Sequence, residues 1–243
     1  MKKIVLCIIS LVLVFTSVGC NNAGQVLPES TPTNLQVEEA NDPTVVFLPA
    51  PADERLELAE KQNKDTVAWL TISGTTIDAA VLQSVDNDYY LRRDSLGAYS
   101  FEGCYFADYE CRFGSDEDRS RNLVIYGHTF QDDEEEQYFA QLHRYIEEEA
   151  WALNNRFINL SIGDTMDTYE IISAGEADAQ NDSLAITAQL TIDEFSQVAT
   201  MAIERSKFDY GVKAAECSQL LTLSTCTGDY SSRLLVVARL VSQ

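Results

Sequence analysis

The sequence predicts a mostly β protein in which about eight strands close into a barrel, with one helix before the strands and a few helices around them. Stretches typical of strands outnumber stretches typical of helices, and regular helical crossovers do not separate them. At 243 residues and 45% hydrophobic content, the chain can bury one sizeable core. These observations favour a single, mostly antiparallel barrel.

The first 20 residues are typical of a secretory signal. Lys2 and Lys3 precede an apolar run over 4–18, and small residues close the run just before Cys20. The run is shorter than the roughly 20 apolar residues that span a bilayer, which favours a cleaved signal peptide over an uncleaved signal anchor. The junction at Cys20 resembles a lipoprotein signal, in which Cys20 becomes lipidated. Both interpretations place the rest of the chain outside the membrane.

Residues 21–51 are predicted to form a flexible tether. They are rich in Pro, Thr, Asn, Gln and Glu and lack apolar periodicity. Such a segment would hold a folded domain some distance from the membrane. Residues 52–243 then form that single folded domain.

The domain begins with a short helix and a pair of strands. A short helical segment carries Leu56, Leu58, Ala59 and Gln62. Two β-rich runs at 67–72 and 77–82 follow, separated by Ser73 and Gly74. The further predicted strands are 103–106, 122–128, 157–162, 168–174, 218–225 and 234–241.

Two more helices are predicted between strands. Between Tyr138 and Ile146 the aromatic and aliphatic side chains recur on one helical face. The second helix opens with Thr191 and Glu194 at the spacing of a capping box, before another apolar face. We interpret both apolar faces as ordinary core.

The chain is strongly acidic, with a formal net charge of -22. Such a field repels polyanions, which disfavours nucleic acid or an anionic surface as a partner. The acidic run 132–136, with residues 116–118 nearby, could bind a hard cation, but its spacing lacks a calcium-loop signature. A solvated charge run is the favoured interpretation. We expect no metal and no cofactor.

Five of the six cysteines have explanations that require no catalysis. Cys7 lies in the apolar run and Cys20 at its end. Cys104 and Cys111 are close enough in sequence to form a disulfide in an oxidising compartment, or to remain as thiols. Cys217 precedes an apolar strand and is predicted to be a small buried hydrophobe.

Cys226 is explained by neither packing nor pairing. It ends the run 220–226, which alternates apolar and hydroxyl residues as a half-buried strand does, and Gly228 follows. A side chain at a strand end is held by a rigid scaffold and still meets substrate, as a nucleophile must. The alternative is a structural cysteine.

His128 lies at the end of another apolar strand, beside Gly127. The glycine leaves room at the strand exit, which favours a reactive histidine over a hydrogen-bonded structural one. The chain contains one other histidine, His143, and we expect that residue at the surface.

Arg233 opens the last predicted strand, seven residues after Cys226. If the two flanking segments pair as a hairpin, Arg233 returns close to Cys226, where a permanently charged guanidinium can donate hydrogen bonds to an oxyanion. A solvated edge charge is the alternative, and Arg239 on the same strand is a less favoured rival.

The segment that ends at Cys226 resembles the signature of the sortases. Residues 222–226 read Thr-Leu-Ser-Thr-Cys and match the pattern Thr-Leu-x-Thr-Cys, with the serine usual in class B, and Arg233 follows in the expected place. Departures occur at Ala79-Ala80, where the family commonly has an aromatic residue and a proline, and in the segment 106–111. Other class B-like segments follow in family order at 65–70, 86–91, 125–128 and 208–212, within a similarity that runs from about Ala52 to Val241.

The resemblance implies a sortase-like closed barrel and a cysteine transpeptidase. Cys226 would attack the carbonyl of a Thr in a C-terminal sorting signal, and His128 would protonate the leaving amine. Arg233, with a nearby hydroxyl or backbone donor, would stabilise the oxyanion. Ser224 and Thr225, within the signature, are the expected substrate-binding residues.

The expected partners follow from the same resemblance. They are a surface protein or pilin that bears a sorting signal, an amine of a cell-wall peptide or pilin, and the membrane through the N-terminus, on the extracytoplasmic side of a Gram-positive type of cell. A hydrolytic cysteine peptidase shares the acyl-enzyme and is the alternative enzyme. A non-catalytic surface lipoprotein that uses the barrel for binding is the alternative outside enzymes.

Overall fold

The computed structural model describes residues 53–115, 117–129, 138–178, 183–226 and 232–242. All of these described residues belong to one compact unit. The predicted signal and tether, Cys20 and the acidic run 132–136 lie outside the described residues. Within the described ranges, no helix has the length and apolar character that a membrane span requires.

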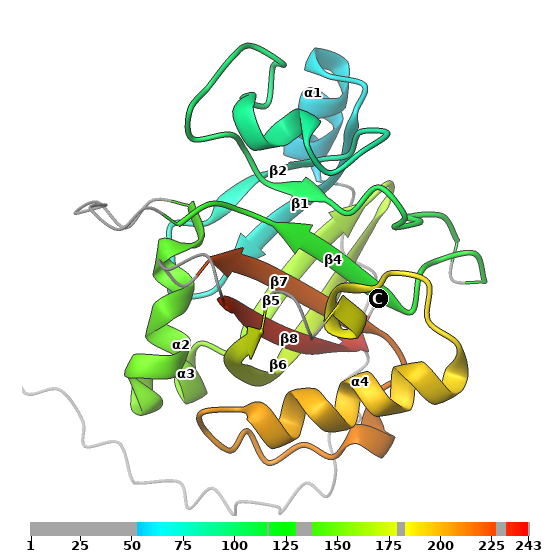
Figure 1. Ribbon diagram of the computed structural model, residues 1–243. Coiled ribbons are helices and arrows are strands. Elements are labelled where there is room, and N and C mark those ends of the chain that lie inside the picture. The colour runs from blue at the N-terminus through cyan, green and yellow to red at the C-terminus, as the bar shows by residue number, and fades with distance from the viewer. Residues whose placement is uncertain (1–52, 116, 130–137, 179–182, 227–231, 243) are drawn as a thin grey trace, which may run out of the picture. The chain divides into compact units, whose positions relative to one another are not determined.

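Eight strands of the described part close into a barrel in the order β1-β2-β3-β4-β7-β8-β6-β5 (Figure 1). Neighbouring strands are antiparallel except β2–β3 and β4–β7, which are parallel. The predicted, mostly antiparallel barrel is confirmed, and the two parallel pairs are the exceptions to the antiparallel pairing. The strands are β1 (Thr66–Ile72), β2 (Asp78–Leu82), β3 (Phe106–Ala107), β4 (Asn122–Tyr126), β5 (Phe157–Ile162), β6 (Thr165–Asp178), β7 (Leu220–Cys226) and β8 (Ser232–Ser242).

Alternation along β7 divides its side chains between two faces. Leu221 and Leu223 are fully buried and belong to the main cluster of the barrel interior, whereas Leu220 packs in a second cluster outside the barrel. That second cluster joins β6 and β8 to the apolar face of α4 (Ile192–Arg205), which lies next to these strands in Figure 1. The outer face of β7 is therefore the face on which a surface site can form.

The helices around the barrel agree in part with the sequence. The capping box at Thr191 is confirmed, since the Thr191 hydroxyl accepts from the Glu194 amide and the Glu194 carboxylate accepts from the Thr191 amide. The predicted helix over 138–146 is instead a 3-10 segment followed by one short α-helix, yet it still buries the apolar side chains. The remaining helices are α1 (Glu54–Gln62), η1 (Tyr89–Arg92), η2 (Tyr138–His143), α2 (Arg144–Glu147), α3 (Glu149–Asn154), η3 (Ser183–Ile186) and η4 (Ala214–Glu216).

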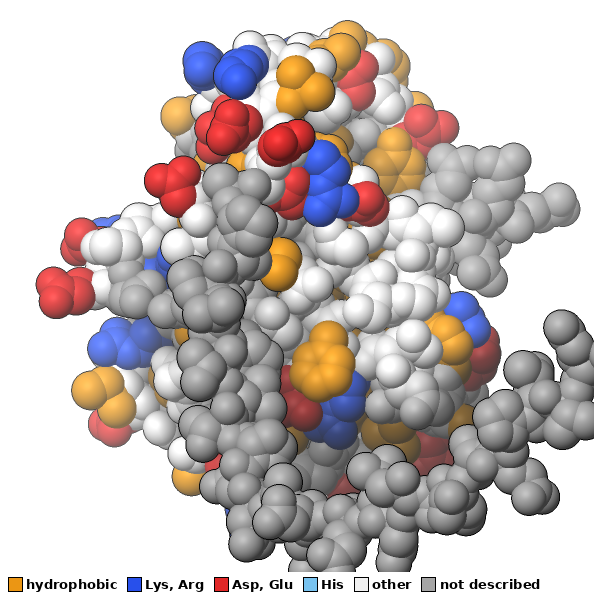
Figure 2. Space-filling view, turned by 180° about the vertical axis from the view of Figure 1, so that it is seen from behind, with side chains coloured by type: hydrophobic (Ala, Val, Ile, Leu, Met, Phe, Trp, Pro, Cys, Tyr) orange, Lys and Arg blue, Asp and Glu red, His pale blue; other side chains and the backbone are white. Residues whose placement is uncertain are grey.

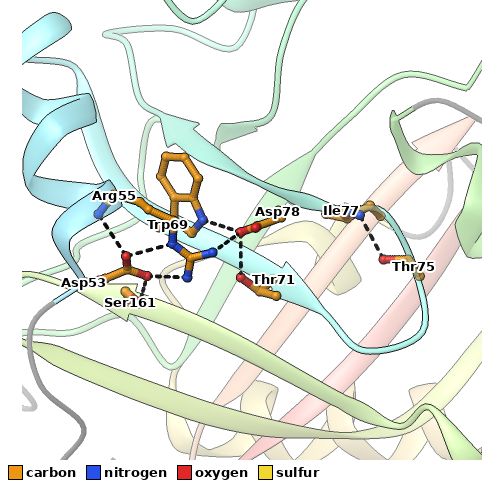
Figure 3. A network of polar contacts seen from close by, with 8 residues as sticks. All are labelled: Asp53, Arg55, Trp69, Thr71, Thr75, Ile77, Asp78 and Ser161. Carbon is orange, nitrogen blue, oxygen red and sulfur yellow. Dashed lines mark hydrogen bonds and ion pairs between the residues drawn. The ribbon is translucent and has the colours of Figure 1, made fainter.

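A polar network fixes α1 against the barrel (Figure 3). Asp53 caps the helix, accepts from the backbone and side chain of Arg55, and also accepts from the Ser161 hydroxyl at 3.0 Å. Arg55 reaches on to Asp78 at 2.6 Å, and the Trp69 indole donates to the same carboxylate oxygen at 2.6 Å. Because these contacts join the N-terminal end of α1 to β1, β2 and β5, the start of α1 has a fixed position.

The acidic character of the chain is visible at the surface of the described part. Acidic side chains are spread over the face shown in Figure 2, with several around the end of the molecule that carries α1. Lys and Arg side chains lie among the acidic ones on the same face.

Candidate active site

A groove on the outer face of the barrel lies over β4 and β7. It encloses a cavity of about 300 Å³. The lining includes four residues that the sequence analysis selected, which are His128, Arg233, Ser224 and Thr225. The other lining residues are Asn87, Asp88, Leu91, Phe106, Tyr126, Gly127 and Ile186.

The parallel pairing of β4 and β7 places His128 beside the end of β7. Tyr126 is in register with Ser224, and the Gly127 amide donates to the Ser224 carbonyl at 3.3 Å. The structure shows why position 127 is a glycine, which the sequence did not reveal. A Cβ atom there would lie 2.7 Å from the ring of Phe139. The glycine thus lets the Phe139 ring pack beneath the turn that carries His128.

The predicted return of Arg233 to Cys226 is confirmed at the backbone level. β7 and β8 are antiparallel, and the Cα atom of Cys226 is paired with that of Arg233. The connecting residues 227–231 and the Cys226 side chain lie outside the described part. The described backbone therefore places position 226 directly opposite Arg233, which is the one arginine among the described residues that line the groove.

His128 is held by a backbone carbonyl. Its Nε2 atom lies 3.0 Å from the carbonyl oxygen of Leu91, which can only accept a hydrogen bond. Burial lowers the pKa of His128 below its ordinary value; the Leu91 hydrogen bond opposes this effect, and the nearby charge of Arg92 adds to it. The imidazole is therefore neutral at neutral pH and suited to accept a proton.

Two polar atoms at the groove are buried without a hydrogen-bond partner among the described residues. They are the Nε atom of Arg233 and the Oγ atom of Ser224. Buried polar groups in folded proteins are nearly always paired, so unpaired ones that line a cavity are candidates to bind a ligand. Thr225 differs, because its hydroxyl makes a 2.8 Å hydrogen bond with the hydroxyl of Thr129.

A buried carboxylate holds two residues that form one wall of the groove, and the sequence analysis did not predict it. Asp108 is 6% exposed and accepts from the Tyr126 hydroxyl at 2.9 Å and from the Asn87 amide at 2.8 Å. Both donors line the groove. The family-like segment 86–91 contained a signal for this wall, but the partnership with Asp108 depends on tertiary structure.

The other described cysteines do not have the properties of a nucleophile. Cys104 and Cys111 are free thiols, 7% and 5% exposed, so the alternative of a disulfide between them is not realised. Burial raises the pKa of each to about 12, which keeps both protonated. Burial also raises the pKa of Cys217, which is partly buried and packs against the second hydrophobic cluster.

The rival arginine has a structural role instead. The guanidinium of Arg239 donates to Glu170 at 2.7 and 2.9 Å and to Glu216 at 3.0 Å, and Arg239 does not line the groove. Among the described side chains, no group of three or more His, Cys, Asp and Glu residues could hold a metal.

Comparison with known proteins gives one consistent result. No protein-family model matches the chain. The chain is 30% identical to sortase B of Listeria monocytogenes over 188 residues, which cover 76% of this chain and 73% of the relative. The structure is similar to that of Clostridium perfringens sortase B, with a TM-score of 0.67 and 26% identity over 76% of this chain and 99% of that one. A Staphylococcus aureus sortase B–substrate complex has a TM-score of 0.67 at 24% identity, and covers 77% of this chain and 85% of its own.

Proposed function

Because the chain belongs to the sortase B family, whose members are cysteine transpeptidases, we propose that Cys226, His128 and Arg233 perform the reaction in the groove over β4 and β7. One observation carries this assignment. The parallel β4–β7 pair and the antiparallel β7–β8 pair bring His128 and Arg233 from two different strands to the end of β7, where Cys226 lies.

The first half-reaction forms a thioester. A free thiol with a pKa of about 8.5 is only a few per cent ionised at neutral pH, so a base must take its proton. In the proposed mechanism, neutral His128 takes that proton and the sulfur of Cys226 attacks a peptide carbonyl. The C–N bond then breaks, and protonated His128 returns the proton to the leaving amine. Arg233 stabilises the oxyanion that forms in between.

The second half-reaction transfers the acyl group to an amine. The amine attacks the thioester carbonyl, His128 takes the surplus proton, and the Cys226 thiolate leaves as the new amide bond forms. A structure of a sortase B–substrate complex and one of sortase B complexed with triglycine support a peptide substrate and an amine acceptor for this chain. We propose a C-terminal sorting signal cleaved at a Thr as the donor, and an amine of a cell-wall peptide or pilin as the acceptor.

Product analysis tests this function. The full-length protein is incubated with a library of sorting-signal peptides and several amines, and the products are identified by mass. We expect a new amide between the acyl fragment and the amine. A hydrolytic peptidase would release only the free acid in excess amine, and a binding module would leave the peptide intact.

The pH dependence of kcat/KM should show an acid limb with an apparent pKa below 6.5, the ordinary value for histidine. Burial lowers the pKa of His128, so its imidazolium loses the proton at a lower pH than an exposed histidine would. Below that pH, His128 is already protonated and cannot take the thiol proton, so activity falls. Initial rates measured from about pH 5 to 8 give the apparent pKa of this acid limb, and circular dichroism shows whether the fold persists over the same range. An acid limb centred above 6.5 would contradict this assignment.

The N-terminus is proposed to anchor the enzyme on the extracytoplasmic side of the membrane through a lipid on Cys20. The short apolar run and the small residues before Cys20 support lipidation over a spanning helix. We expect mass analysis of the membrane fraction to find a mature chain that begins at a lipid-modified Cys20. Cys20→Ala should prevent this processing. A wild-type chain that still begins at Met1 in the membrane would show that a signal anchor is used instead.

A further inference from the structure

We propose that η1 is a positioning element of the active site, in which the backbone carbonyl of Leu91 fixes the tautomer of His128 and thereby selects Nδ1 as its basic nitrogen. The proposal rests on the proposed catalytic function of His128. The described contact is the 3.0 Å approach of the His128 Nε2 atom to the Leu91 carbonyl oxygen.

The chemistry of that contact decides which nitrogen acts. A carbonyl oxygen only accepts, so the Nε2 atom must carry the proton when the bond forms. A neutral imidazole has one N–H group, which leaves the lone pair on Nδ1. If the Leu91 carbonyl moved away, the two tautomers would become closer in energy and a fraction of the enzyme would present the wrong nitrogen to the thiol. An interaction that fixes a catalytic histidine in one tautomer can therefore change turnover without touching the substrate.

Tyr90 anchors the Leu91 carbonyl to the body of the domain. The Tyr90 side chain is 1% exposed, and its hydroxyl donates to the Asp65 carboxylate at 2.7 Å and accepts from the Asn63 amide at 3.0 Å. Asn63 is the C-cap of α1, and the network of Figure 3 holds the opposite, N-terminal end of the same helix against the barrel. These contacts link the position of η1 to rigid elements on both sides of the α1–β1 connection.

Gly103 packs closely against the same carbonyl. Its backbone has φ +65°, and a Cβ atom there would lie 2.8 Å from the carbonyl oxygens of both Tyr90 and Leu91. No side chain fits at that distance, so any residue other than glycine must displace η1. Gly97 provides a matched comparison, because it also has positive φ, at +82°, but a Cβ atom there would meet nothing within 4 Å.

The test compares Gly103→Ala with Gly97→Ala in the full-length protein. Both variants place alanine at a positive φ in the same connection, but only Gly103→Ala is expected to displace the Leu91 carbonyl. The readouts are kcat with one peptide and one amine, and the ¹⁵N chemical shifts of the imidazole nitrogens, which report the tautomer directly. The chain has only two histidines, so His143→Gln assigns the signals of His128.

We expect wild-type His128 to show a protonated Nε2 atom at neutral pH. Gly103→Ala should populate the other tautomer and lower kcat by about a hundredfold, the scale of a misplaced catalytic group. Gly97→Ala should retain the wild-type signals and nearly full turnover. Wild-type signals in Gly103→Ala, or an equal loss of kcat in the two variants, would overturn the proposal.

Tyr90→Phe keeps the proposal testable if Gly103→Ala does not fold. The variant keeps the buried ring and removes only the hydroxyl that bonds Asp65 and Asn63. A mixed tautomer with a lowered kcat supports the proposal, and unchanged signals in the folded variant refute it. Because the tautomer is read in the free protein, the result does not depend on turnover. Failure of the proposed function would appear separately, as absence of transpeptidation by the wild-type protein.

Discussion

Cys226→Ala is expected to abolish thioacyl adducts and to lower turnover by a factor on the order of a million, the scale seen when a covalent nucleophile is removed. The reason is chemical, since alanine has no atom that can form the thioester. The groove, His128 and Arg233 remain, so peptide binding should persist. Labelling by a thiol-reactive substrate analogue and turnover with one peptide and one amine are the two measurements.

Cys217→Ala is the matched control for that experiment. Cys217 is partly buried outside the groove, with its sulfur 3.9 Å from the Lys213 carbonyl oxygen. Its removal should leave both labelling and turnover close to the wild-type values. Labelling that persists in Cys226→Ala and disappears only when Cys217 is also removed would show that Cys217 is the nucleophile.

Arg233→Lys is expected to lower kcat by about a hundredfold to a thousandfold, with a far smaller change in peptide affinity. A fixed guanidinium beside the developing oxyanion gains strength in the transition state and little in the ground state. Lysine keeps the charge but loses the planar fork of donors. The Nε atom of Arg233 at the groove has no hydrogen-bond partner among the described residues, and this supports the role because a donor there can bind a substrate oxygen.

Arg239→Lys makes the same chemical change six residues further along β8. Arg239 is held by Glu170 and Glu216 and does not line the groove. The substitution should lower stability somewhat and leave kcat nearly intact. Near-normal turnover in Arg233→Lys, or an equal loss in both variants, would remove Arg233 from the site.

The strands of the barrel were predictable because apolar and polar residues alternate along a half-buried strand, one kind on each face. The alternation along β7 predicts a strand without any knowledge of its neighbours. The parallel pairing of β4 with β7 was not predictable in this way, since it joins Asn122 to Leu220 across most of the domain. Pairing between distant segments depends on the path of the whole chain, which local patterns do not encode.

The same distinction between local and long-range contacts applies to the residues of the candidate site. Cys226 and Arg233 face each other on the two strands of one hairpin, next to their short connection, so their proximity followed from local sequence. The contributions of Leu91 and Asp108 did not, because one acts through a backbone carbonyl and the other through a buried network. A carbonyl carries no sequence signature, and a buried aspartate is recognised only by its partners.

The central claim is transfer of an acyl group through a thioester on Cys226, and trapping the acyl-enzyme tests it most directly. The full-length protein is mixed with an intact sorting-signal peptide that it can cleave, first without and then with excess amine. The protein is then digested, and the mass of each fragment is measured. The account predicts an acyl mass on the fragment that contains Cys226, which disappears on addition of amine as the new amide forms. An acyl mass on any other residue, or release only as free acid in excess amine, would contradict it.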